Sequence, residues 1–284
     1  MTNIAFGNID VLPGTAIDAT GTISIHCTTD PNITVRTCIS INAGQASDST
    51  SRQMVGPSSA KLRFDLYSDS THTQKWGSYV NGFDTAGVSF NFSSGSTGTI
   101  TATKTVFARV FASQQTSVPG AYTSSFSGQP VVDYNDAGSS CPLNASTATT
   151  SFTTTATVIT SCNVSATTLN FGSTSTLGSV VDGSSTLTAT CTSASAYNIG
   201  LSAGNGSGAT VAARKMTSGL NTITYSLYTN SLRTTVWGNT VGTNTVSGTG
   251  SGSAQNFTVF GRVPTQTTPA PAAYSDTIIA TVTY

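Results

Sequence analysis

The feature that most limits the possible folds of this chain is an internal repeat. The segment "FDLYSDSTHTQKWG" in the first half matches "YSLYTNSLRTTVWG" in the second half, and further matches follow the same order. The aligned pairs are Phe6 with Phe171, Cys27 with Cys191, Tyr67 with Tyr228, Trp76 with Trp237, Arg109 with Arg262 and Tyr122 with Tyr274. Because this period is far longer than one coil of a solenoid, the sequence indicates two copies of one domain. We place these domains at residues 1–148 and 149–284.

The composition favours β-structure in both copies. Ser and Thr together make up about a third of the residues, Glu is absent and Lys occurs four times. The best helix formers are therefore scarce, whereas residues that prefer strands are plentiful. A copy of roughly 130–150 residues fits an immunoglobulin-like sandwich of short strands. The repeated Trp and Tyr residues are then expected in the core or at corners of the fold, not in a binding site.

Charge and residue types argue against several classes of function. The net charge is zero and only 8% of the residues are charged, so nucleic acid is not an expected partner. No apolar run is long enough for a transmembrane segment. No CxxC pair occurs and the two histidines stand far apart, so neither a metal site nor a cofactor is expected. With no nucleophile elbow near either histidine and only scattered Asp residues, we do not expect an enzyme.

Five cysteines indicate disulfides formed in an oxidising compartment, yet the odd number leaves one thiol over. Cys162 lies nine residues before Phe171, so the repeat places its counterpart upstream of Met1. We therefore hypothesise a precursor that continues upstream with a cysteine and a secretory signal, because "MTNIAFGNID" has no signal-peptide pattern. The pairs under this hypothesis are Cys162 with Cys191, Cys38 with Cys141, and Cys27 with the upstream cysteine. If the chain starts at Met1, Cys27–Cys38 is the expected first-domain bridge.

Two segments near the domain ends alternate like half-buried strands. Residues 152–158, which precede Cys162, alternate Thr with Phe, Ala and Val. The closing segment "SDTIIATVTY" alternates Thr with apolar residues and predicts a terminal strand that no turn or polar tail follows. The apolar positions of this strand are Ile278, Ala280, Val282 and Tyr284.

These elements resemble the spore coat protein U domain, the pilin fold of archaic, Csu-type chaperone–usher pili. The matching motifs are "SCNVSATTLNFG" at 161–172, "TCT" at 190–192, "VFGRVPTQTTPAPAAYSDTIIATVTY" at 259–284, and their first-copy counterparts. The resemblance covers both halves, and the closing motif is its most specific part. The first copy departs from the pattern because it lacks the opening cysteine and carries extra residues after Trp76.

The resemblance implies an all-β chain of two immunoglobulin-like β-sandwich domains. The C-terminal one is implied to be an incomplete pilin sandwich that donor-strand complementation completes, with Ile278, Ala280, Val282 and Tyr284 at the strand acceptor and chaperone-binding edge. The implied partners are a periplasmic pilus chaperone, an outer-membrane usher and an adjacent pilin subunit. The implied route is secretion through the periplasm to the pilus tip at the cell surface.

Segment 149–161 occupies the place of the family's donor strand. A whole domain precedes it, so it cannot readily serve a separate subunit, and we expect it to pair in cis with the first domain or to form a stiff link. A subunit that accepts a strand but has none to give can lie only at the distal end of a fibre. The implied function is therefore a tip adhesin that attaches cells to surfaces, above all hydrophobic or abiotic ones, and promotes biofilm formation.

Tip adhesins of this family can bind through apolar loops of the first domain. Candidate loops are the apolar segments that the second copy lacks, because shared residues are expected to serve the fold. The candidate surface-binding residues are Val11, Leu12 and Pro13, then Met54 and Val55, then Tyr79, Val80 and Phe83. The third loop is the best candidate, since it lies where the first copy is longer and places Gly, Asn and Asp between its apolar residues.

Two alternatives remain open at this point. A glycan-binding pilus adhesin, with a host ligand, could use an aromatic platform and polar partners from the same loop. Its site residues would be Trp76, Tyr79, Asn81 and Asp84. The other alternative is a minor pilin or a spore-coat structural subunit, which needs no ligand at all.

Overall fold

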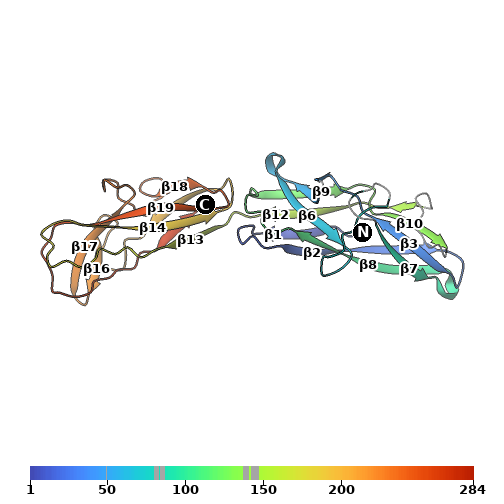
Figure 1. The fold of residues 1–284 in the computed structure, drawn as a ribbon, viewed down its shortest axis with the longest axis horizontal. Coiled ribbons are helices and arrows are strands. Elements are labelled where there is room, and N and C mark those ends of the chain that lie inside the picture. Colours follow the sequence, from blue (N-terminus) through green and yellow to red (C-terminus); the bar gives the residue numbers. More distant parts are fainter. Residues whose placement is uncertain (49, 80–82, 84–86, 137–140, 142–146) are drawn as a thin grey trace. The chain divides into compact units, whose positions relative to one another are not determined.

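The computed structural model describes the chain except at residues 49, 80–82, 84–86, 137–140 and 142–146. It divides into two compact units, Met1–Ile159 and Thr160–Tyr284. Strands dominate both units, and each unit pairs its strands into a larger and a smaller sheet (Figure 1). The boundary between the units falls inside segment 149–161, which the sequence assigns to the second domain. Residues up to Ile159 belong to the first unit, because strand 152–158 is hydrogen-bonded into its sheet.

The first unit contains a larger sheet in the order β1-β12-β9-β5-β6-β8-β2, with β4 beside β5, and a smaller sheet in the order β11-β10-β3-β7. Its elements are β1 (Ile4–Ile9), β2 (Ile17–Thr28), β3 (Thr34–Ser40), β4 (Ala46–Ser47), β5 (Arg52–Val55), the 3-10 turn η1 (Pro57–Ser59), β6 (Lys61–Tyr67), β7 (Val88–Ser93), the 3-10 turn η2 (Gly95–Thr97), β8 (Thr99–Val110), β9 (Gly120–Phe126), β10 (Val131–Asp136), β11 (Thr147–Thr149) and β12 (Phe152–Val158). In the part of the chain that the structure describes, no helix is long and apolar enough to cross a membrane.

The second unit repeats this plan with fewer strands. Its larger sheet has the order β13-β14-β19-β17-β16, and its smaller sheet has the order β18-β15-β20. The strands are β13 (Cys162–Ala166), β14 (Val181–Cys191), β15 (Ala196–Leu201), β16 (Arg214–Ser218), β17 (Asn221–Tyr228), β18 (Val246–Thr249), β19 (Ala254–Val263) and β20 (Ala280–Thr283). The all-β architecture and the two sandwich-like units agree with the predicted fold class.

Alternating side chains build a core in each unit. In β2, for example, Ile23 and Ile25 are buried while the intervening Ser24 is exposed, as expected for a strand with one face against a core. The repeated tryptophans are fully buried and make the same bond: Trp76 donates from Nε1 to the Ile39 carbonyl oxygen at 2.9 Å, and Trp237 to that of Ile199 at 2.8 Å. These tryptophans are core residues, as the repeat predicted.

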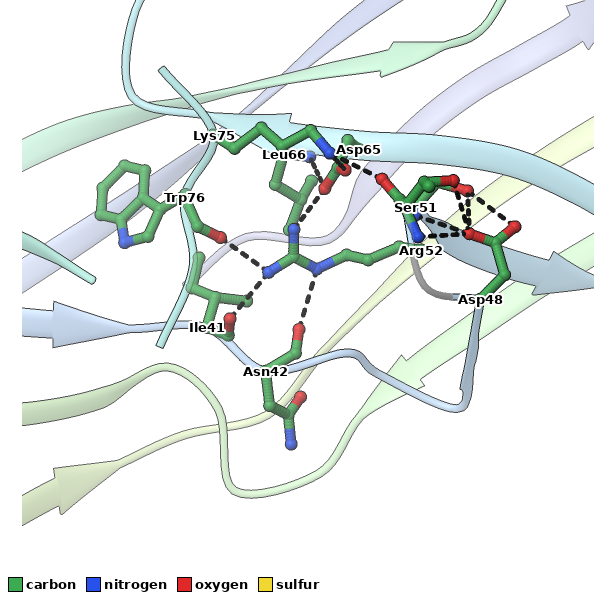
Figure 2. A network of polar contacts seen from close by, with 10 residues as sticks. Ile41, Asn42, Asp48, Ser51, Arg52, Asp65, Leu66, Lys75 and Trp76 are labelled. Carbon is green, nitrogen blue, oxygen red and sulfur yellow. Dashed lines mark hydrogen bonds and ion pairs between the residues drawn. The ribbon is translucent and has the colours of Figure 1, made fainter. Parts of the chain in front are cut away.

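A buried ionic network lies beside Trp76 in the first unit (Figure 2). The Arg52 guanidinium pairs with the Asp65 carboxylate, and both side chains are 0% exposed. Lys75 Nζ lies 3.2 Å from the second oxygen of that carboxylate. The guanidinium also donates to the main-chain carbonyl oxygens of Ile41, Asn42 and Trp76 at 2.7–2.8 Å. The network therefore fixes the chain at Trp76, where the third candidate loop begins.

The second unit repeats the arginine without the carboxylate at the equivalent position. Arg214 donates to the Leu201 and Trp237 carbonyl oxygens, as Arg52 does to their counterparts, but Ser226 stands where the first unit has Asp65. Burial lowers the pKa of Arg214 to about 10 because it disfavours the charged guanidinium.

Both predicted disulfides of the described chain are present. Cys38 is bonded to Cys141, and Cys162 is bonded to Cys191. Cys27 is a free thiol, so the alternative bridge between Cys27 and Cys38 is wrong. Cys38 cannot pair with Cys27 because its sulfur is already bonded to that of Cys141, 103 residues later in the chain.

Candidate functional site

The first unit shows how a complete sandwich of this plan is closed. Strand β12 lies between β1, to which it is parallel, and β9, to which it is antiparallel. The antiparallel ladder runs from Phe152 opposite Phe126 to Val158 opposite Gly120. The side chains that β12 buries are Phe152, Thr154, Ala156 and Val158, each at most 3% exposed. The segment that follows the first domain therefore completes that same domain, in agreement with the expected pairing in cis.

The second unit has no strand in the corresponding place. By the repeat, residues 169–174 correspond to β1 and residues 272–278 correspond to β9. In this unit, which the structure describes throughout, residues 169–174 belong to no strand, and residues 272–278 form only an isolated bridge between Ser275 and Thr217. The sandwich is therefore incomplete where the first unit contains β12.

A groove of about 490 Å³ lies between these two unpaired segments. Leu169 and Phe171 come from one side, Tyr274 and Ile278 come from the other, and core residues of the sheets lie between them. The core residues that line the groove are Leu187, Leu201, Met216, Tyr225, Leu227 and Val259. The hydrophobic core of the second unit is thus reached directly from the groove.

Exposure of the paired positions supports this assignment. In the first unit Ile4, Phe6, Tyr122 and Phe126 are at most 9% exposed. Their counterparts in the second unit, which are Leu169, Phe171, Tyr274 and Ile278, are all only partly buried. The side chains are of similar kinds in both units, so the difference lies in the missing strand that would cover them.

Polar contacts hold the 272–278 side of the groove in place. Tyr274 donates its hydroxyl to the Ala270 carbonyl oxygen at 2.7 Å, as Tyr122 does to that of Val118 at 2.9 Å. Tyr225 donates to Asp276 Oδ2 at 2.8 Å. Burial and this bond to a carboxylate raise the pKa of the Tyr225 hydroxyl, so it remains a donor at neutral pH. The segment is therefore positioned although it has no neighbouring strand on the side of the groove.

The terminal strand is shorter than the sequence predicted. Only Ala280–Thr283 forms β20, which pairs with β15 in the smaller sheet. Of the predicted acceptor residues, Ile278 and Ala280 line the groove, whereas Val282 packs on the core next to it and Tyr284 is 60% exposed. The physical reason is that residues before Ala280 have only single main-chain partners, Ile279 with Ser202 and Ser275 with Thr217, and a strand needs a continuous ladder.

The candidate surface-binding residues of the first two loops differ from one another in exposure. Val11, Leu12 and Met54 are at most 9% exposed and belong to the interior of the first unit, so we remove them from the binding surface. Pro13 is exposed and Val55 is half-buried. Sequence comparison missed this because an apolar residue outside the repeat can still pack into the core of its own copy.

The third loop is only partly described. Tyr79 and Phe83 are half-buried, and Val80 lies outside the described residues. The Phe83 ring lies over the Arg52 guanidinium, 4.7 Å from it. Trp76 is fully buried and cannot be a sugar platform, and Asn81 and Asp84 of the proposed glycan site also lie outside the described residues.

Solved structures of other proteins share the fold of this chain. A chain of the crystal structure of the CsuC–CsuE chaperone–tip adhesion subunit pre-assembly complex, from archaic chaperone–usher Csu pili of Acinetobacter baumannii, matches with a TM-score of 0.59. The match covers 99% of both chains at 16% sequence identity, so it shows a common fold. A chain from a chaperone–tip adhesin complex of CFA/I fimbriae matches 100% of this chain over 94% of its own length, at a TM-score of 0.34 and 10% identity. No curated protein matches the chain.

The sequence profile of the Spore Coat Protein U domain matches the chain twice, at residues 1–128 and 148–281. The two matches correspond to the two copies of the internal repeat, and together they cover nearly the whole chain. Membership of this family points to a structural or adhesive protein and not to an enzyme. The chain belongs to the Spore Coat Protein U domain family, with two copies of the domain in tandem.

Proposed function

We propose that this chain is the tip subunit of an archaic chaperone–usher pilus. One observation carries the proposal: β12, which stands in the donor position, is buried between β1 and β9 of its own domain, whereas the equivalent groove of the second unit is open. Such a chain can accept a strand from another molecule through its second unit. Its own donor-like strand is already in use, so β12 cannot serve a second subunit, as the distal position in a fibre requires.

The physics of the groove favours an extended apolar peptide as its occupant. Main-chain hydrogen bonds to residues 169–174 and 272–278 would give affinity, and alternate side chains entering the groove would set the register. Each Val-, Ile- or Phe-sized side chain that is fully buried contributes about 1.5–3 kcal/mol. An empty groove exposes core and strand edge together, which promotes aggregation. The proposed occupants are first a periplasmic chaperone and then the adjacent pilin subunit, with an outer-membrane usher as the assembly site.

The two disulfides fit passage through an oxidising compartment such as the periplasm. We propose a secretory signal upstream of Met1, and display at the cell surface follows from the tip position.

The groove assignment is tested by filling the groove from the chain's own end. We extend the chain after Tyr284 by a flexible Gly/Ser linker of about 20 residues and a copy of residues 151–159. Tyr134, which the strand register makes the counterpart of Tyr284, lies a similar distance before Phe152. We expect the extended chain to lose co-purification with the pilus chaperone and to be a stable monomer. A matched control carries Ser in place of the copied Phe, Ala and Val, and it should still bind the chaperone. Chaperone binding by both chains would refute the assignment.

We propose further that the loop containing Tyr79, Val80 and Phe83 attaches the pilus to hydrophobic surfaces. The Trp76 carbonyl, three residues before Tyr79, is fixed by the Arg52 guanidinium (Figure 2). Phe83 packs its ring over the same guanidinium. Apolar side chains gain roughly 25 cal/mol per Å² when they leave water, whatever the chemistry of the surface.

Replacing Tyr79, Val80 and Phe83 by Ser should reduce attachment to polystyrene at least about tenfold, because a kilocalorie or more is lost with each side chain. Pilus number should be unchanged, since the groove lies in the second unit. Piliated cells are counted by electron microscopy, and bound cells are counted after washing. Normal attachment by the mutant would rule out this loop, and loss of attachment in the presence of one free sugar would favour a glycan ligand.

A further inference from the structure

The outer edge of β2 in the first unit differs from the equivalent edge in the second unit. In the second unit β13 pairs antiparallel with β14, with Cys162 opposite Cys191 and Ala166 opposite Leu187, and the two cysteines form a disulfide. Strand β2 is the counterpart of β14, and within the described residues it is the last strand of its sheet. Beyond Thr22, which is bonded to Thr2, its outer edge therefore presents unpaired main-chain groups, which form a template for a further strand.

Hydrogen bonds at the beginning of the chain fix the register for such a strand. Thr2 donates its N–H to the Thr22 carbonyl oxygen, and Thr22 donates its N–H to Thr2 Oγ1, both at 2.9 Å. Thr167 and Thr186 make the same two bonds at the same distances in the second unit. Met1 thus stands where Ala166 ends β13, opposite the residue equivalent to Leu187, which is Ile23.

A groove of about 500 Å³ runs along this edge of β2. Met1, Ile23, Ile25 and Cys27 line one side of it. Pro130 and Val132, at the beginning of β10, lie among its other lining residues. In the second unit β13 lies against β20, the counterpart of β10, so it fills the corresponding space. The groove has the place and the direction that a strand equivalent to β13 needs, and apolar side chains alternate along its β2 side with Ser24 and His26.

The thiol of Cys27 is the remaining part of the site. Its counterpart Cys191 is 0% exposed and disulfide-bonded, whereas Cys27 is a half-buried free thiol in the groove. Burial raises the pKa of the Cys27 thiol, because it disfavours the thiolate.

We propose that the open edge of β2 binds an antiparallel strand joined to the amino side of Met1, with a cysteine four residues before Met1 that forms a disulfide with Cys27. This register follows from the pairing of Ala166 with Leu187 and of Cys162 with Cys191. The oxidant is a low-molecular-weight disulfide such as glutathione disulfide. Its S–S bond breaks, the new S–S bond forms between the two protein sulfurs, and the two protein thiol protons pass to the two released glutathione thiols. This inference does not depend on the proposed function.

The test adds the missing strand to the full chain. A copy of residues 161–165, "SCNVS", is placed directly before Met1, and the protein is incubated with glutathione disulfide. We expect both added and native thiols to become unreactive to maleimide under denaturing conditions, and peptide mapping to find the added cysteine bonded to Cys27. The thermal midpoint of the first unit should rise by at least about 5 °C, because the new bridge closes a loop like that of Cys162–Cys191.

The matched control moves the cysteine by one residue, as "SNCVS", so that it falls opposite His26 and faces the other side of the sheet. This control should keep its thiols or form only mixed disulfides with glutathione. Equal cross-linking in both registers, or a free Cys27 in a natively folded "SCNVS" chain, would overturn the proposal. If "SCNVS" does not fold, the serine version "SSNVS" decides: it should slow amide exchange at residues 24–28, and unchanged exchange there would equally overturn it.

Discussion

Replacing Ala156 by Asp is expected to unfold the first unit or to destabilise it by about 3–5 kcal/mol. Ala156 is 3% exposed and lies on β12, opposite Tyr122 on β9. A carboxylate there would be buried without a partner, and an uncompensated buried charge costs about that much. The free energy of unfolding of a native domain is only about 5–15 kcal/mol, so this loss is a large fraction of its stability. The change leaves every residue of β1 and β9 untouched, and it therefore tests the role of β12 alone.

The control is Thr157→Asp, one residue further along the same strand. Thr157 is exposed, so its carboxylate would remain in water and the change should cost less than about 1 kcal/mol. Urea unfolding is followed by tryptophan fluorescence in a Trp237→Phe background, where Trp76 alone reports the first unit. Equal effects of the two substitutions would mean that β12 is not an integral strand of this domain.

Replacing Asp65 by Asn is expected to destabilise the first unit by about 3 kcal/mol or more. The substitution keeps the shape of the side chain but removes the negative charge between Arg52 and Lys75 (Figure 2). Arg52 is 0% exposed, so its charge cannot be rescued by water, and breaking a buried ion pair costs about 3–5 kcal/mol. The fixed carbonyl of Trp76 should loosen as well, which would weaken the support of the candidate surface loop.

Asp18→Asn is the matched control for this prediction. Asp18 accepts two hydrogen bonds from Arg109 at 2.7 Å, but its side chain is 47% exposed. The Arg109 guanidinium holds the pKa of the Asp18 carboxyl below its usual range, yet solvent screens an exposed pair, so we expect a loss below about 1 kcal/mol. The same fluorescence assay compares the two variants. If Asp65→Asn were no more costly than Asp18→Asn, the buried network would not be a structural support.

Much of the fold follows from the sequence because the repeat compares each position with a second copy. The burial of Trp76 and Trp237 and the Cys162–Cys191 bridge follow from this comparison. The Cys38–Cys141 bridge is the pair left over under the hypothesis of an upstream cysteine, because neither cysteine is repeated in the second copy. The pairing of residues 152–158 within the first domain was expected as one of two possibilities, and only the structure decided between them. A period-two pattern predicts that a strand exists but contains no information on which edge it joins.

The groove and the surface were harder to predict for a physical reason. Apolar alternation in "SDTIIATVTY" predicts a strand, but a strand also needs a neighbour. Residues 272–278 have only an isolated bridge, from Ser275 to Thr217, in the isolated chain. An apolar residue in a candidate loop is also not necessarily exposed. Met54 and Leu12 lie in such loops, yet both are buried in the interior of the first unit. The groove is recognised in the structure by the partial exposure of Leu169, Phe171 and Tyr274. No sequence pattern predicts that exposure, because their counterparts in the first copy are similar residues that are buried.

The most direct test of an open acceptor groove is amide hydrogen exchange on the full chain. Exchange is measured for the free chain and for its complex with the pilus chaperone or with the adjacent pilin subunit. Amides of residues 153–157 should be protected in the free chain, because β12 is already paired on both sides. Within residues 272–278, Ser275 donates its N–H to the Thr217 carbonyl oxygen. The other amides of this segment should exchange rapidly in the free chain and become protected only when another polypeptide fills the groove. Protection of 272–278 in the isolated monomer, equal to that of 153–157, would contradict an open acceptor in the second unit.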